Sequence, residues 1–367
     1  MTSNPSPIAR LLEYGQSPWY DNLRRKLIED GDLARMAADD GIRGVTSNPT
    51  IFEKAVSAGE EYDAPVAELA GQGLSTDDIG WKLVTEDVAA ACEVLRPVFE
   101  SSGGADGFVS VEVDPTLAHD TEATITQARQ LHTRLGLENL MVKIPATAEG
   151  IPAIQAMIAE GRKINVTLIF SLERHAEVIE AYLSGLERLV AGGGDPSQVA
   201  SVASFFVSRV DTEADRRLPE GHPLRGKVAV ANAKLAYQLF RQRFSGERWE
   251  RLAAAGARLQ RPLWASTSTK NPEYSDTLYV DELVGHDTVN TLAPASLEAL
   301  RDHGDPRADT IEAGLDEARA VMDGLATAGV DYDDLTATLE REGVDAFARS
   351  YQDFLAALDK RKKELVA

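Results

Sequence analysis

Residues 140–145, LMVKIP, form a short apolar run that Lys143 interrupts. Alternate residues of a β-strand point to opposite faces, so the branched apolar residues share one face and Lys143 lies on the other with Met141. A lysine is almost never fully buried without a partner, because removing an ammonium group from water costs several kcal/mol. The run is therefore either an exposed strand or a buried strand that holds its lysine in the interior for a chemical purpose.

Similar β-prone runs alternate with longer helical patterns along the 367-residue chain. The predicted strands are PWYDNL (18–23), GVTSNP (44–49), FVSVEV (108–113), LMVKIP (140–145), INVTLIF (164–170), VASFFVS (202–208), PLWAS (262–266) and DTVNTLAP (287–294). Such alternation predicts parallel strands joined by right-handed crossovers. Eight candidates favour a closed (β/α)8 barrel of the TIM type. An open, doubly wound sheet is the alternative, although no strand is followed by the glycine fingerprint of a dinucleotide site.

The domain organisation follows from the lack of any Pro- or Ser-rich linker, so we expect residues 1–367 to form a single α/β domain. A helical insertion is predicted near 211–260 and a helical C-terminal extension near 295–367. The glycines at 192–194 precede a predicted strand. We therefore expect them to end a helix at the amino-terminal face of the barrel, away from its chemistry.

Composition narrows the class of protein. Apolar residues make up 43% of the chain, and its net charge of −21 argues against nucleic acid or an anionic membrane as a partner. The lone cysteine, Cys92, excludes a disulfide framework, and we find no signal-peptide block or membrane-length apolar run. The six histidines lack the spacing of a metal site. We expect a soluble cytoplasmic protein whose oligomeric state, monomer or homodimer, the sequence leaves open.

Polar side chains collect on one face of the predicted strands, while branched apolar side chains occupy the other. The polar set is Glu112, Lys143, Asn165, Thr167, Ser204 and Ser266. In a closed barrel this face points inward, near the carboxyl-terminal mouth where barrel enzymes keep their active sites. A solvent-exposed sheet face is the alternative, but strands covered by crossover helices have no wet face. Lys143 is therefore predicted to be an active-site lysine.

A lysine in such a place can act as a nucleophile, because burial disfavours the charged form of an amine. The amine can attack a carbonyl and form a Schiff base, which serves as an electron sink for breaking or making a carbon–carbon bond. Glu112 and Thr167, on neighbouring strands, have suitable groups for moving protons and positioning water. A plain Lys143–Glu112 ion pair is the alternative, but it would leave Asn165, Thr167 and Ser204 buried for no evident gain.

Five segments together resemble the signature segments of transaldolases, in the same order. They are GVTSNPTIF (44–52), VSVEVDPTLAHD (109–120), VKIPATAEGI (142–151), INVTLIFS (164–171) and ASFFVSRVD (203–211). The stretch that begins WASTSTKNP at 264 is similar to the longer, actinobacterial-type members, and the resemblance covers roughly residues 10–360. It implies a barrel with its Schiff-base lysine on the fourth strand. It also implies reversible transfer of a dihydroxyacetone unit between sugar phosphates, without cofactor or metal.

The resemblance also implies the roles of the catalytic residues. Lys143 matches the Schiff-base lysine, and Asp21 matches an aspartate that takes up and returns a hydroxyl proton. Glu112 and Thr167 match the pair that holds and activates a water. For Asp21, a helix N-cap is the alternative interpretation.

Substrate-binding residues are implied in the same way. Asn48, Asn165 and Ser204 match donor-binding positions, with a turn or barrel packing as the alternative. Arg209 matches a phosphate-binding arginine, although an ion pair with Asp211 or Asp215 is the other possibility. Many family members place a second arginine after the seventh strand. Here Ser266 and then Lys270 occupy that region, and lysine also binds phosphate.

Two other functions compete with a transaldolase. A fructose-6-phosphate aldolase would share the lysine but release free dihydroxyacetone, and its known relatives are shorter. A non-catalytic barrel that binds sugar phosphates would keep Arg209 and Lys270 but would not need a nucleophile with acid–base partners.

Overall fold

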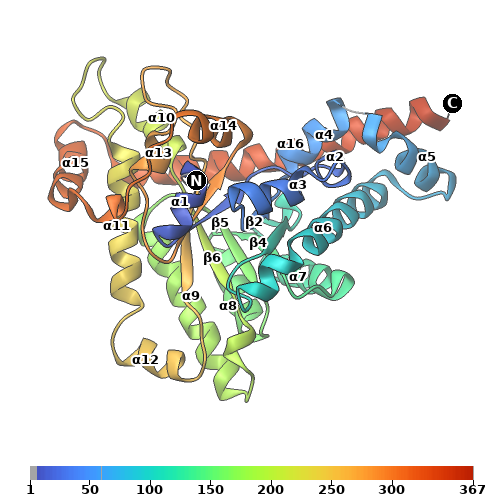
Figure 1. Ribbon diagram of the computed structural model, residues 1–367, viewed down its shortest axis with the longest axis horizontal. Coiled ribbons are helices and arrows are strands. Elements are labelled where there is room, and N and C mark those ends of the chain that lie inside the picture. The colour runs from blue at the N-terminus through green and yellow to red at the C-terminus, as the bar shows by residue number, and fades with distance from the viewer. Residues whose placement is uncertain (1–5, 59, 367) are drawn as a thin grey trace, which may run out of the picture.

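The computed structural model describes residues 6–58 and 60–366, within which eight parallel strands close into a barrel in the order β1 to β8 (Figure 1). The strands are β1 Gln16–Tyr20, β2 Gly44–Thr46, β3 Phe108–Glu112, β4 Leu140–Pro145, β5 Ile164–Ile169, β6 Ser201–Phe206, β7 Gln260–Ala265 and β8 Thr288–Leu292. β1 pairs with β8 as well as with β2, which closes the sheet. The (β/α)8 prediction is confirmed, and the open-sheet alternative is wrong.

Helices fill the crossovers between the strands. They are α1 Pro7–Glu13, α2 Arg25–Glu29, α3 Asp32–Arg35, α4 Pro49–Ala58, α5 Asp63–Gly71, α6 Thr76–Ser101, α7 Thr121–Leu135, α8 Gly150–Ala159, α9 Leu172–Ala191, α10 Ser208–Arg217, α11 Val228–Arg243, α12 Glu247–Ala254, α13 Leu278–Asp281, α14 Pro294–His303, α15 Leu315–Thr327 and α16 Tyr332–Val366. The local sequence explains several boundaries. The side chain of Ser171 accepts the backbone N–H of Arg174 and so caps α9. The glycines at 192–194 follow the end of the same helix, as predicted.

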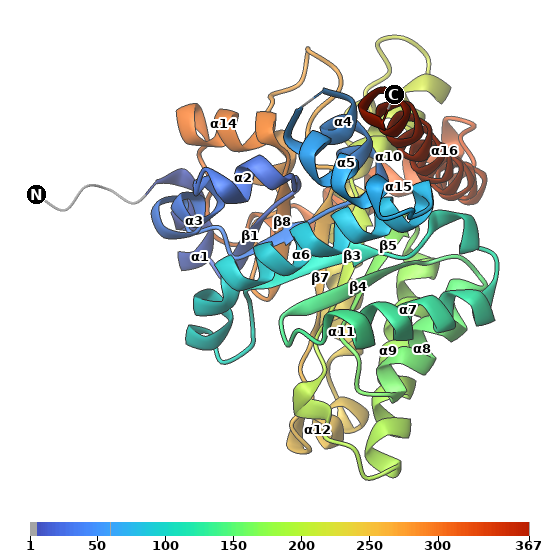
Figure 2. The same cartoon turned by 90° about the vertical axis from the view of Figure 1, so that its right-hand side faces the viewer.

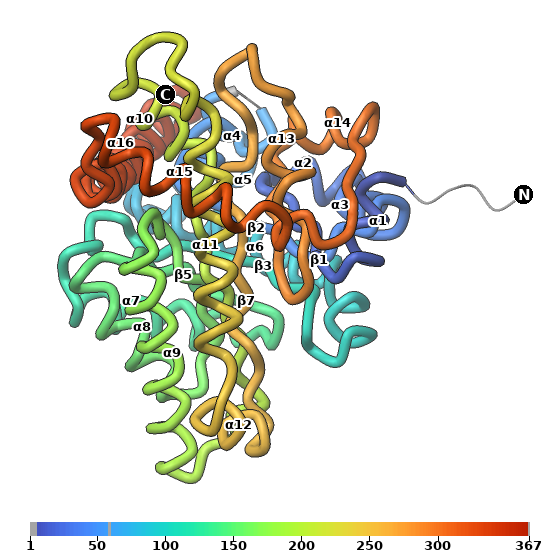
Figure 3. Tube along the Cα trace, turned by 90° about the vertical axis from the view of Figure 1, so that its left-hand side faces the viewer, coloured from blue at the N-terminus to red at the C-terminus, as the bar shows by residue number. Residues whose placement is uncertain are grey.

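The extra helices occupy the regions that the sequence indicated. Between β6 and β7 lie α10, α11 and α12, although α10 already begins at Ser208, earlier than expected. After β8 the chain continues through α14, α15 and α16. α11 contacts both α9 and α15 (Figure 3), while α16 contacts α4 and α5 (Figure 2). That residues 1–367 form a single domain stays a prediction.

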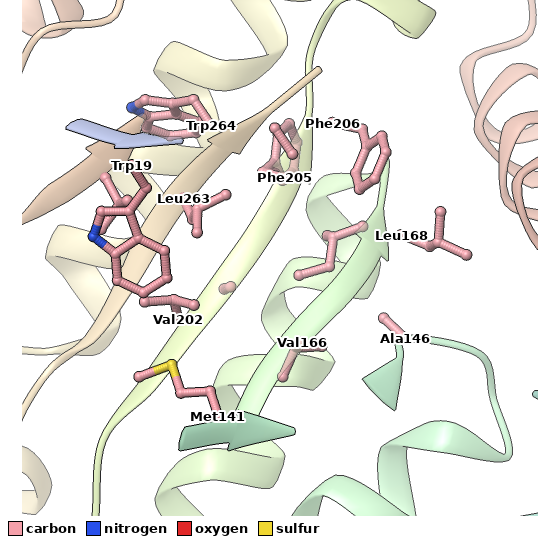
Figure 4. Close-up of a cluster of buried hydrophobic side chains, with 14 of the residues drawn as sticks. Trp19, Met141, Ala146, Val166, Leu168, Val202, Phe205, Phe206, Leu263 and Trp264 are labelled. Atoms are coloured by element: carbon pink, nitrogen blue, oxygen red, sulfur yellow. The ribbon is translucent and has the colours of Figure 1, made fainter. Parts of the chain in front are cut away.

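Buried apolar side chains from several strands pack against one another inside the barrel. Trp19, Met141, Val202 and Leu263 project into it from four strands (Figure 4), and all are buried. Position 44 on β2 is occupied by glycine for a steric reason. A Cβ at Gly44 would lie only 2.4 Å from Cδ2 of Trp19.

β5 and β7 depart from the regular alternation on which the predicted faces relied. In β5 the register shifts between Val166 and Ile169, and Leu168, between them, adopts a left-handed conformation with φ of 60°. In β7 the side chains that face the interior are Leu263 and Ala265, and the strand ends before Ser266. Ser266 was expected on the inward face of the strand. It reaches the interior instead through its own left-handed conformation, with φ of 57°.

None of the helices within the described residues is long and apolar enough to cross a membrane. Cys92 is buried in α6 and forms no disulfide.

Candidate active site

The predicted site residues gather at the carboxyl-terminal end of the barrel. One cavity, with an empty volume of about 660 Å³ including its open mouth, is lined by Asp21, Asn48, Lys143, Thr167, Ser204, Arg209, Ser266 and Lys270. Cavities of this size commonly bind small metabolites. Glu112 and Asn165 do not line it but contact residues that do. The predicted residues that line the cavity thus come from segments up to 249 residues apart in the chain, from Asp21 to Lys270.

Lys143 stands at the base of this cavity on β4. Its side chain is almost entirely buried, and Nζ donates a hydrogen bond to the carbonyl oxygen of Ser47 at 3.2 Å. The same Nζ lies 3.4 Å from Oε2 of Glu112 on β3. This is the ion pair that the alternative interpretation requires. Lys143 also lines the cavity, so the pair does not remove its amine from a ligand's reach.

The environment of Glu112 makes its carboxylate a good proton acceptor. Burial raises the pKa of Glu112, the Lys143 ammonium opposes that shift, and the charge of Asp21 adds to it. Burial disfavours the charged forms of both groups, so a proton can pass from the ammonium to the carboxylate and leave both groups neutral. That transfer would leave Lys143 with the free amine that nucleophilic attack needs.

Glu112 and Thr167 both keep hydrogen-bonding capacity. Among the described residues, neither Oε2 of Glu112 nor Oγ1 of Thr167 forms a hydrogen bond, although both atoms are buried. Buried polar atoms are normally paired, and functional sites account for many of the exceptions. Both strands lie next to β4: Glu112 is paired with Lys143 itself, and Thr167 with Pro145, two residues farther along β4. This arrangement suits two groups that share a water at the lysine.

Asp21 follows β1 directly, and its backbone N–H donates to the carbonyl oxygen of Leu292 at 2.9 Å. The hydroxyl of Thr46 donates to Oδ1 of Asp21 at 2.6 Å, which holds the carboxylate at the cavity wall. The N-cap interpretation is wrong, because α2 begins at Arg25 and Arg24 occupies its cap position. Asp21 was predicted within the first strand. That strand ends one residue earlier, at Tyr20, so the alternation of side chains along the strand does not fix the direction of Asp21.

Three of the predicted substrate ligands have structural partners. Asn165 links Ser204 to Ser110: Ser204 Oγ donates to Asn165 Oδ1 at 2.7 Å, and Asn165 Nδ2 donates to Ser110 Oγ at 3.0 Å. Asn48 Oδ1 accepts the backbone N–H of Ile51 at the start of α4, which agrees with the turn interpretation. Asn48 also lines the cavity, so the two interpretations do not exclude each other. Binding of substrate by these residues stays a prediction.

The far end of the cavity is cationic. Burial lowers the pKa of Lys270, and the charges of Arg209 and Lys54 lower it further, while Asp21 opposes the shift. Burial also lowers the pKa of Arg209, against the charge of Glu342. Cations so placed attract an anion through short-range contacts, which a chain of net charge −21 needs.

Arg209 forms no ion pair with Asp211 or Asp215, so that alternative is wrong. Asp211 accepts the backbone N–H of Ala229 and the hydroxyl of Tyr279, both at 2.8 Å. The two oxygens of Asp215 accept the backbone N–H of Gly226 and the hydroxyl of Tyr274.

Several neighbours were not predicted. Thr46 and Ser47, which position Asp21 and Lys143, stood inside the motif GVTSNP and could have been singled out there. Lys54 and Phe347 carry no signal of their own, because each has the polarity expected of its place on a helix. Among the described residues, no cluster of three or more His, Cys, Asp or Glu side chains has the arrangement of a metal site.

A buried lysine beside a carboxylate, in a barrel cavity that also holds cationic side chains, is the set of groups that Schiff-base-forming aldol enzymes use. Comparison with known families gives the particular family. Residues 18–358 match the model described as "Transaldolase/Fructose-6-phosphate aldolase", and the chain belongs to this family.

Relatives extend over nearly the whole chain. A protein named "Transaldolase" from Saccharopolyspora erythraea is 52% identical over 358 residues, covering 97% of each chain. Another "Transaldolase", from Acidothermus cellulolyticus, is 51% identical over 356 residues, or 96% of each chain. A third, from Mycolicibacterium smegmatis, is 50% identical over 372 residues, which cover 99% of this chain and all of the relative. The predicted resemblance to actinobacterial members is confirmed.

Proposed function

We propose that this enzyme is a transaldolase that transfers a dihydroxyacetone unit from a ketose phosphate to an aldose phosphate. Fructose 6-phosphate and sedoheptulose 7-phosphate are the donors, and erythrose 4-phosphate and glyceraldehyde 3-phosphate are the acceptors. This is the reversible carbon exchange of the non-oxidative pentose phosphate pathway. The observation that most strongly supports this proposal is the buried amine of Lys143, in a cavity that also holds the cationic side chains of Arg209 and Lys270.

The first half of the reaction builds and uses the imine. Lys143 attacks the C2 carbonyl of the donor, and loss of water from the resulting carbinolamine gives the Schiff base, with Glu112 and Thr167 holding the water that leaves. Asp21 then takes the proton of the C4 hydroxyl. The C3–C4 bond breaks, its electron pair moves into the imine to give an enamine, and the aldose phosphate departs.

The second half reverses these steps on a new acceptor. The enamine carbon attacks the acceptor aldehyde, and Asp21 returns its proton to the new hydroxyl. Water held by Glu112 and Thr167 then hydrolyses the imine and frees Lys143. Arg209, Lys270 and Ser266 hold the phosphate, which places the reacting carbons at the lysine. The proposed compartment is the cytoplasm, which suits a chain whose lone Cys92 is buried and unpaired.

Trapping the intermediate tests the proposal. Borohydride added with fructose 6-phosphate should attach a three-carbon adduct to Lys143, which peptide mass spectrometry locates. Lys143→Ala and Lys143→Arg should lose both adduct and turnover. An adduct on a different lysine, or full activity without Lys143, would contradict the mechanism.

A fructose-6-phosphate aldolase is the second candidate, because the family model includes that activity in its description. The measurement that separates the two is the release of free dihydroxyacetone. We expect little release from fructose 6-phosphate alone and rapid exchange once erythrose 4-phosphate is added.

A further inference from the structure

Arg209 is held by aromatic rings and not by a carboxylate. Its guanidinium carbon lies 5.4 Å from the centroid of the Phe206 ring and 5.9 Å from that of the Phe347 ring. Both rings also line the cavity. A guanidinium so close to two aromatic rings is attracted by their π-electrons, and the attraction is stronger where water is excluded.

The charge of Arg209 therefore stays available to a ligand. Among the described residues it has no ion-pair partner, and the neighbouring Asp211 and Asp215 are hydrogen-bonded elsewhere. A carboxylate in place of the rings would fix the side chain equally well but would compete with an incoming anion. Two rings instead limit its rotation and leave its N–H groups to an incoming anion.

Phe347 reaches this position because α16 lies close to the mouth of the barrel. Gly343, one turn earlier on the same face of the helix, contacts the end of β5: a Cβ there would lie 3.1 Å from Cδ2 of Leu168. Farther along, the hydroxyl of Ser350 lies 2.7 Å from that of Thr50 on α4. α16 also contacts α10, the helix that carries Arg209 (Figures 2 and 3). The ring is thus delivered by a helix fixed to the barrel on both sides of Phe347.

We propose that Phe347 is a positioning residue for phosphate recognition, which acts by holding the guanidinium of Arg209 toward the donor's phosphate. The proposal rests on the proposed function, because Arg209 must itself be a phosphate ligand. It makes the C-terminal helix part of substrate selection. The aromatic face of Phe347 favours phosphorylated donors over unphosphorylated ones without touching the reacting carbons.

The experiment compares aliphatic and aromatic replacements. Phe347→Leu and Phe347→Met keep an apolar side chain but lose the ring, whereas Phe347→Tyr keeps it. For both aliphatic variants we expect KM for fructose 6-phosphate and the inhibition constant of inorganic phosphate to rise about 3- to 10-fold. kcat, and KM for unphosphorylated dihydroxyacetone as donor, should stay near wild type. Phe347→Tyr should behave as the wild type does.

Phe354→Leu is the matched control on the same helix. Its ring lies 6.4 Å from those of Phe52 and Tyr351, and no contact with Arg209 is found among the described residues. We expect this variant to retain wild-type selectivity for phosphate, with its folding followed by thermal melting as for the others.

Several outcomes would overturn the proposal. They are an unchanged phosphate inhibition constant in Phe347→Leu and Phe347→Met, an equal loss with both kinds of donor, an equal loss in Phe347→Tyr, and failure of both aliphatic variants to fold. Arg209→Ala distinguishes a wrong role for Phe347 from a wrong phosphate site in the proposed function. If Arg209→Ala loses phosphate selectivity while the Phe347 variants keep it, only the role of Phe347 is wrong. If Arg209→Ala also keeps selectivity, the phosphate site itself is misplaced.

Discussion

Replacing Glu112 with Gln decides whether its pair with Lys143 serves catalysis or only structure. The substitution keeps the shape of the side chain but removes a charge 3.4 Å from Nζ of Lys143. At that distance and an effective dielectric constant near 20, the Coulomb attraction is about 5 kcal/mol, which desolvation offsets in part. Losing one partner of a buried pair typically costs about 3–5 kcal/mol of unfolding free energy. We expect the lower end, because Lys143 keeps its bond to the Ser47 carbonyl.

The effect on turnover should be much larger than this change in stability suggests. Without the carboxylate, the water shared with Thr167 loses its proton acceptor, so we expect kcat to fall by about 10²- to 10⁴-fold. The assay is steady-state transfer from fructose 6-phosphate to erythrose 4-phosphate, with urea unfolding measured on the same samples. Borohydride trapping should still find an adduct on Lys143 in Glu112→Gln, formed more slowly than in the wild type.

Glu340→Gln is the control for the loss of an ion pair. Glu340 lies 3.3 Å from Arg174 outside the cavity, and both side chains are partly exposed. This variant should lose some stability and keep its turnover. Near-wild-type turnover in Glu112→Gln would show that the carboxylate is only a structural partner of Lys143, and the catalytic role assigned to it would be refuted.

Other predictions follow from the same geometry. Asp21→Asn should fold normally, but the rate of its bond-breaking step should fall by about 10²- to 10⁴-fold. Exchange of labelled aldose phosphate would measure that rate. Thr167→Val should form and hydrolyse the imine more slowly, as measured by single-turnover trapping. Arg209→Ala and Lys270→Ala should each raise KM for fructose 6-phosphate about 10- to 150-fold, the effect of losing a charge-assisted contact, and an equal defect with unphosphorylated donors would contradict a phosphate role. Burial raises the pKa of Asp211 from 3.8 to about 6. The folded state therefore binds a proton that the unfolded state releases, and stability should fall by up to about 3 kcal/mol as pH rises from 4 to 6 and then level off. Asp211→Asn should flatten that slope in urea unfolding, and an unchanged slope would refute the assignment.

The sequence alone determined the fold and the chemical centre, because both rest on local regularities. Strand–helix alternation predicted the barrel, since parallel strands need helical crossovers. The two-residue period placed Glu112, Lys143 and Thr167 on the inward face of adjacent strands, since a pleated strand has only two faces. These residues lie in the middle or later part of β3, β4 and β5, where pleating fixes their direction.

Residues beyond the strand ends were predicted less well, because nothing local fixes their direction. Asp21 and Ser266 reach the cavity from just outside β1 and β7, and Ser266 does so through a left-handed backbone. The bulge at Leu168 also breaks the alternation on which the prediction for β5 relied. Such irregularities depend on how strands meet neighbours distant in sequence, which a strand pattern does not record.

Only the tertiary structure decided the surroundings of Arg209. The sequence offered Asp211 and Asp215 as partners because they are near along the chain, yet both turn to other donors. Phe206, three positions away, and Phe347, 138 positions away in the sequence, are the side chains that pack on Arg209. An apolar residue on an amphipathic helix has the same pattern whether it fills a core or faces a ligand cavity. The docking of α16 at the barrel mouth, made possible by the close approach at Gly343, is what gives Phe347 its place.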